Sequence, residues 1–145
     1  MIKPFQYYLQ EKLVRKSSSN VSMGKSLIEK AELRLKKVGR EKIEEEEASI
    51  SFEETYEVLR EALQSLMEIK GFKPYSHEAI ISFVKEYNLL SSEKINIVDN
   101  YRILRNNSVY KAEKVSLEKC EEALNFAKLT LPEIRKVFER LIKER

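Results

Sequence analysis

The strongest constraint on the fold is an apolar stripe in the last quarter of the chain. Steps of alternately three and four residues after Ser116 give Leu117, Cys120, Leu124, Ala127, Leu131, Ile134, Phe138 and Leu141. This heptad spacing is typical of α-helices that pack at shallow angles. Pro132 removes one backbone donor inside the stripe, yet the phase continues beyond it. We therefore predict one long helix that follows Ser116 and bends at Pro132.

Apolar residues at helical spacing continue through the rest of the chain, whereas no segment reads as a strand. The expected helices cover 4–16, 22–39, 51–70, 77–87 and a fifth from 92 to the region of 106. The expected start signals are Ser22, a capping box of Ser51 with Glu54, Ser76, and Ser91 or Ser92; the expected stops are Gly39 and Gly71. The helix over 51–70 has a broad apolar arc, which indicates a central position.

Composition agrees with a helical chain, because only three Gly and three Pro occur in 145 residues and hairpin proteins need many more. The sequence thus predicts an all-α fold. One Cys and one His exclude a disulfide framework and a zinc cluster within one chain. We expect no metal and no cofactor.

Charge is distributed unevenly along the chain. Residues 1–40 hold ten Lys or Arg against three acidic residues, 41–78 hold four against eleven, and 79–145 hold thirteen against ten. Such asymmetry is compatible with self-association or anion binding, although solvated helix faces are the commoner explanation. No apolar run reaches the ~20 residues of a membrane span and the N-terminus does not read as a signal peptide. The expected location is the cytoplasm, without membrane contact.

The candidate functional residues lie in the segment YRILRNNSVYK, residues 101–111. Cations, tyrosines and asparagines gathered in so short a segment suit a phosphate and a stacked base. The candidate contacts are Arg102, Arg105, Asn106, Tyr110 and Lys111. The alternative is structural: Asn106 or Asn107 would close the fifth helix, and the arginines would lie at its negative end.

Two further residues have a structural and a chemical interpretation. His77 follows the predicted cap Ser76, where a general base is conceivable. A first-turn histidine packed beside Gly71 and Tyr75 is the favoured interpretation. Cys120 lies on the apolar stripe, which favours a core residue over a nucleophile.

Several segments resemble the HEPN superfamily (higher eukaryote and prokaryote nucleotide-binding domains). TYEVLREALQSLMEIKGFKPYSHEAIISFV resembles its central helices, and YRILRNNSVYKAEKVS resembles its functional segment, an Arg followed by a polar residue and, four to six positions after the Arg, a His. SMGKSLIEKAELRL and VSLEKCEEALNFAKLTLPEI fit the first and last helices. The resemblance spans residues 22–142. It implies an HEPN-like, up-and-down bundle of four core helices plus short extra helices, with residues 1–21 as an N-terminal extension, expected to be helical, and residues 22–145 as the domain.

The resemblance implies a homodimer, and many relatives are metal-independent ribonuclease toxins encoded beside a nucleotidyltransferase antitoxin. Arg105 and Asn106 take the family's Arg and polar positions, so Arg105 and Tyr110 are the candidate catalytic pair. Tyr110 stands where the family has His. A phenol with a pKa near 10 is only ~0.1% ionised at neutral pH and is a poor general base.

From this departure we expect a homodimeric domain that binds RNA or a nucleotide, with weak or absent ribonuclease activity. One alternative is an active ribonuclease toxin paired with a nucleotidyltransferase antitoxin. A second is a purely structural helical interaction protein.

Overall fold

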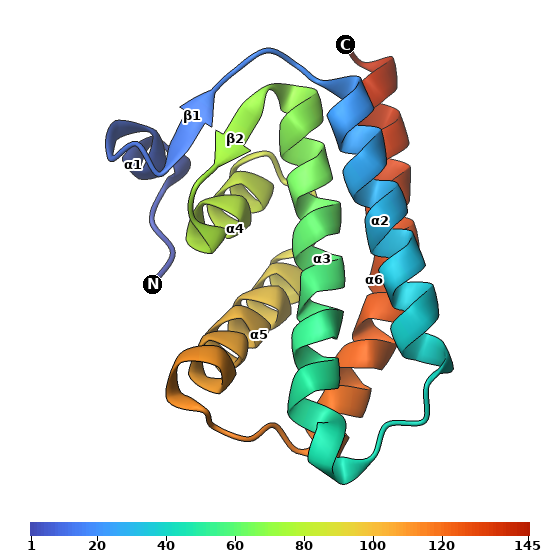
Figure 1. Ribbon diagram of the computed structural model, residues 1–145. Coiled ribbons are helices and arrows are strands. Elements are labelled where there is room, and N and C mark those ends of the chain that lie inside the picture. Colours follow the sequence, from blue (N-terminus) through green and yellow to red (C-terminus); the bar gives the residue numbers. More distant parts are fainter.

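The computed structural model describes residues 1–145 as six α-helices and one small sheet (Figure 1). The predicted all-α class is confirmed. The elements are α1 (Phe5–Gln10), β1 (Val14–Lys16), α2 (Val21–Arg40), the 3₁₀ turn η1 (Glu45–Glu47), α3 (Ala48–Lys70), β2 (Phe72–Pro74), α4 (His77–Glu86), α5 (Ser92–Lys111) and α6 (Leu117–Lys143). None of these helices combines the length and the apolar character that crossing a bilayer requires.

Helix α3 occupies the centre of the molecule, as its broad apolar arc predicts. Helices α2 and α6 lie along one side of it, and α4 and α5 lie on the other (Figure 1). The chain runs in the same direction in α3 and α6 and in the opposite direction in α2. Leu59, Leu63 and Leu66 of α3 are almost completely buried in a continuous core. The stripe of α6 supplies Ile134 and Phe138 to the same core.

Several predicted helix boundaries are confirmed. Gly71 ends α3 in the left-handed conformation at φ 85°. Ser76, Ser91 and Ser116 cap α4, α5 and α6 by accepting hydrogen bonds from backbone amides of the first turn. Helix α6 continues through Pro132 as one element, because the apolar side chains on both sides of the proline enter one core.

Other predicted boundaries are wrong. The cap of α2 is Asn20, which accepts from the amide of Met23 at 2.9 Å, and the helix runs one residue past Gly39. The capping box at Ser51 does not form, because α3 already begins at Ala48. Ser51 is instead buried in the second turn, where its carbonyl accepts from the hydroxyl of Thr55. Core packing of Ala48 extends α3 beyond the local start signal.

The prediction of a helix over 4–16, and that of a chain without strands, are corrected by the structure. Helix α1 stops at Gln10, and β1 pairs with β2 in antiparallel register, with Lys16 opposite Phe72. The chain leaves α3 in an extended conformation after Gly71, so its backbone groups need partners that no helix supplies. Residues 1–21 also enter the main core through Phe5, Tyr8 and Val14.

The end of α5 differs from the prediction too. Asn106 and Asn107 are helical, and the left-handed residue that closes the helix is Ala112, at φ 54°. The hydroxyl of the buried Ser108 donates to Glu53 Oε2 at 2.7 Å, which attaches this turn of α5 to α3. This tertiary contact favours continuation of the helix to Lys111 over an early stop.

Candidate functional site

A pocket of about 330 Å³ lies between the start of α4 and the last turns of α5. It contains four of the five predicted contact residues. Its lining residues are Tyr75, Ser76, His77, Glu78, Arg102, Arg105, Asn106 and Tyr110. The predicted contact that does not line it is Lys111, an exposed residue at the end of α5.

Arg102 is a buried cation that is paired with two carboxylates. Its Nε donates to Asp99 Oδ1 at 2.8 Å, and its Nη1 lies 3.5 Å from Glu78 Oε1. Glu78 also accepts from the Tyr8 hydroxyl at 3.2 Å. Two carboxylates therefore offset the charge of Arg102, which supports the wall of the pocket more than it attracts a ligand.

Arg105 is the cation of this pocket that has no carboxylate within ion-pair distance, in contrast to Arg102 and to nearby Arg60, which pairs with Glu57. Its Nη1 donates to Asn106 Oδ1 at 3.2 Å. Its guanidinium carbon lies 5.9 Å from the centre of the Tyr110 ring, within cation–π range. The guanidinium is thus positioned by neutral groups, and its charge remains available to an anion.

Tyr110 is 75% exposed at the mouth of the pocket. Its ring is held on one side by Arg105, while the rest of its surface faces solvent. An aromatic ring in this position suits a nucleobase, because stacking needs only a free face.

His77 also lines this pocket, which the sequence argument did not anticipate. Its ring stacks on Tyr56 of α3, with centroids 5.8 Å apart and planes 29° apart. Its Nδ1 lies 3.1 Å from the Tyr56 hydroxyl oxygen. The favoured interpretation placed the ring against Gly71 and Tyr75. The ring instead packs on Tyr56 and at the same time faces the pocket of Arg105.

The protonation of His77 follows from these neighbours. Burial lowers its pKa below the usual 6.5, and the cations of Arg60 and Arg105 lower it further. Burial also raises the pKa of Tyr56, so this hydroxyl stays protonated. The Tyr56 hydroxyl and Nδ1 share one hydrogen bond, in which either group can be the donor depending on the tautomer of the ring. In the tautomer in which Tyr56 donates to Nδ1, the proton of the neutral ring is on Nε2 and can be donated to a phosphate oxygen.

The start of α4 adds positive potential to the pocket. Ser76 Oγ accepts from the amides of Glu78 and Ala79 at 3.1 and 3.4 Å, which fixes the first turn of this ten-residue helix. The free amide ends of a helix carry partial positive charge and favour a nearby anion. Together with Arg105 and His77, this geometry makes the pocket suitable for one phosphate group.

The signal for His77 was present in the sequence only in part. The cap Ser76 correctly placed His77 in the first turn of α4. Nothing local showed that this turn meets the last turns of α5, 28 positions later, because that depends on how both helices pack on α3. No group of three His, Cys, Asp or Glu side chains is arranged to hold a metal.

No protein-family model, no curated protein and no solved structure matches this chain. The fold and the pocket define an all-α protein with a small polar pocket between α4 and α5 that contains the unpaired Arg105.

Proposed function

We propose that this chain is a HEPN-like homodimeric domain whose pocket binds the phosphate of RNA or of a nucleotide, with little or no ribonuclease activity. The observation that carries the proposal is the carboxylate-free guanidinium of Arg105, which faces one pocket with His77 and Tyr110. A guanidinium contacts phosphate oxygens through several parallel donors. The exposed Tyr110 ring beside it supplies a stacking surface for a base.

Weak catalysis is the expected consequence of the same groups. The position of the family's His holds a phenol, which is a poor general base. His77 lies on a different helix, and its Nδ1 shares a hydrogen bond with the Tyr56 hydroxyl, which supports a structural and binding role for this ring. General acid–base help is typically worth 10²–10⁴-fold. Without this acid–base help, the pocket would bind RNA and cleave it slowly or not at all.

The homodimer is supported by the outer face of α5. A stripe on this face carries no charge, although 35% of the chain is charged. We call it the α5 stripe: Ser92, Asn96, Asn100, Ile103, Asn107 and Tyr110, of which all but the half-buried Asn107 are exposed. In a two-fold dimer the same patch of both chains meets, so an uncharged face with amides avoids like-charge repulsion. Tyr110 belongs to both the stripe and the pocket, so such a dimer would place both pockets beside the interface.

The second candidate is an active ribonuclease toxin with a nucleotidyltransferase antitoxin. The specific observation in its favour is that His77, the only histidine, lines the pocket of Arg105. In that case His77 would be the tautomer that donates from Nδ1 to Tyr56, and its free Nε2 would take a proton from the attacking hydroxyl. Cleavage of RNA by the native protein, lost on His77→Gln, would favour this candidate.

The test of the main proposal is binding of a fluorescently labelled single-stranded RNA, followed by anisotropy at several salt concentrations. Arg105→Ala should weaken binding by about 1–3 kcal/mol at every sequence, because a charge-assisted phosphate contact is lost. Arg140→Ala is the matched control, since Arg140 is an exposed arginine at the far end of α6, paired with Glu144. Equal affinities of all three proteins would contradict the proposal and favour a structural interaction protein.

A further inference from the structure

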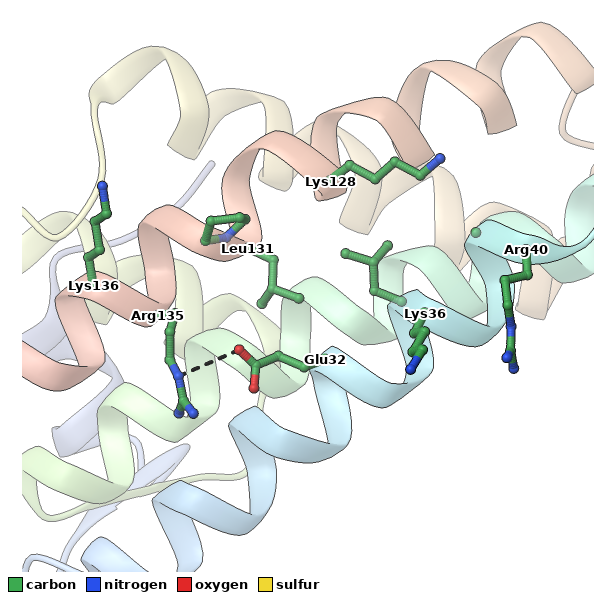
Figure 2. A pocket seen from close by; sticks show the side chains of 10 residues that line it. Glu32, Lys36, Arg40, Lys128, Leu131, Arg135 and Lys136 are labelled. Atoms are coloured by element: carbon green, nitrogen blue, oxygen red, sulfur yellow. Dashed lines mark ion pairs between the residues drawn. The ribbon is translucent and has the colours of Figure 1, made fainter.

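A second cavity, of about 640 Å³, lies between α2 and α6, and neither the sequence argument nor the proposed function uses it. Its floor is apolar, formed by Leu35, Leu131 and the ring of Pro132. Figure 2 shows Leu131 directed from α6 toward α2, with cationic side chains from both helices around it. We call this cavity the α2–α6 groove.

The rim of the α2–α6 groove carries uncompensated positive charge. Lys36 and Arg40 come from α2, and Lys128 and Lys136 come from α6. None of these four forms an ion pair, whereas Arg135 pairs with Glu32 at 3.5 Å. That pair connects the two helices across the groove (Figure 2). All four are exposed, and their positive charge around the groove would attract an anion.

Two features shape the groove. Gly39 lines it without a side chain, and a Cβ there would come within 3.3 Å of the Lys128 side chain. Arg135, which also lines the groove, has a buried Nη1 without a hydrogen-bond partner. An apolar floor beside a few polar groups is the usual composition of a small-molecule site.

We propose that the α2–α6 groove binds a small organic anion with an apolar body, the body on Leu35, Leu131 and Pro132 and the anionic group between the rim cations. The size supports a small molecule, because ligand pockets usually measure about 300–1,000 Å³. The groove is lined from Glu32 to Arg40 and from Lys128 to Lys136, which is only about two and a half helical turns on each side. A helix of a partner protein would have only a short length of groove to contact.

The probe is 2-naphthyl phosphate, whose fluorescence reports binding, compared with 2-naphthol and with inorganic phosphate. The proposal predicts that naphthyl phosphate binds at least about tenfold more tightly than either half, since floor and rim contribute together. Equal binding of naphthol would reduce the site to an apolar patch. Equal binding of inorganic phosphate would reduce it to a charged surface, the result also expected of a docking face for an acidic protein segment. Either outcome overturns the proposal.

Variants locate the binding. Gly39→Leu should fill the groove and weaken naphthyl phosphate by about tenfold or more. Lys36→Gln combined with Arg40→Gln should weaken it by a similar factor without altering the floor. Lys37→Gln is the matched control, because Lys37 is an exposed neighbour that does not line the groove. Arg105→Ala should leave the affinity unchanged, which separates this site from the proposed RNA pocket. Affinity lost on Arg105→Ala but kept in the groove variants would overturn the assignment.

Discussion

Arg105 and Arg102 show how neighbours decide what an arginine can do. Both lie on α5 three residues apart and both line one pocket. Arg102 is buried between Asp99 and Glu78, and Arg105 contacts only an amide and an aromatic ring. The sequence placed both in one candidate segment but could not rank them, because Glu78 reaches Arg102 from another helix. The same limit hid His77 from the predicted site.

A substitution at Tyr110 tests the catalytic part of the account. Tyr110→His introduces an imidazole that titrates near neutral pH beside Arg105. We expect metal-independent cleavage of labelled RNA to appear or to rise, by up to the 10²–10⁴-fold that acid–base help typically supplies. The assay contains excess chelator at neutral pH.

Two further variants complete this comparison. Adding Arg105→Ala to Tyr110→His should abolish the gain, because the phosphate loses its cation. Brisk cleavage by the native protein that disappears on Tyr110→Phe would contradict the account and make the tyrosine catalytic.

At the scale of elements, local signals predicted the helix boundaries well where the residue that caps or ends a helix is adjacent to that helix in the sequence. Serine caps and the left-handed Gly71 are of this kind, and they were found. The signals failed where a contact with a residue distant in the sequence determines the element, as at Ala48, at Ser108 and in the strand pair of β1 and β2. Predicting the small sheet requires knowing that residues 14–16 lie beside the strand that follows α3. No spacing in the sequence carries that information.

Gly71 gives a prediction about stability. Its φ of 85° is costly for other residues, and a Cβ there would lie 2.5 Å from the Ser17 carbonyl oxygen. Gly71→Ala should therefore lower the free energy of unfolding by about 1–3 kcal/mol. Gly39→Ala is the matched control: that glycine is helical and meets only the end of a flexible lysine, so the change should be neutral or stabilising by up to about 1 kcal/mol. Urea unfolding of the three proteins measures both effects, and equal losses from the two variants would contradict this reading.

At the scale of the whole molecule, the heptad stripe of α6 is almost entirely buried within the chain. Its residues pack against α3 within one chain, so this stripe offers no support for a dimer. The uncharged α5 stripe remains exposed on the other side of the bundle. The predicted homodimer thus depends on α5 and not on α6, the helix with the heptad spacing.

Light scattering at tens of micromolar tests that dimer. The account predicts twice the mass of one chain for the native protein and a monomer for Ile103→Glu, which places like charges opposite each other across the two-fold axis. Leu129→Glu is the control, because Leu129 is an exposed apolar residue on α6, outside the α5 stripe. A native monomer at this concentration would correspond to no more than about 6 kcal/mol of association and would contradict the prediction.

The most direct test of the central claim is the titration of His77 by proton NMR, with and without a saturating single-stranded oligoribonucleotide. His77 is the only histidine, so its ring signals are unambiguous. In the free protein its pKa should lie below 6.5, because burial and nearby cations disfavour the imidazolium. Bound RNA should raise this pKa, because a phosphate in the pocket stabilises the charged ring. The same RNA concentration should raise the pKa less in Arg105→Ala, because this variant binds RNA more weakly. A native His77 whose signals and pKa ignore RNA that is demonstrably bound would contradict the assignment of this pocket.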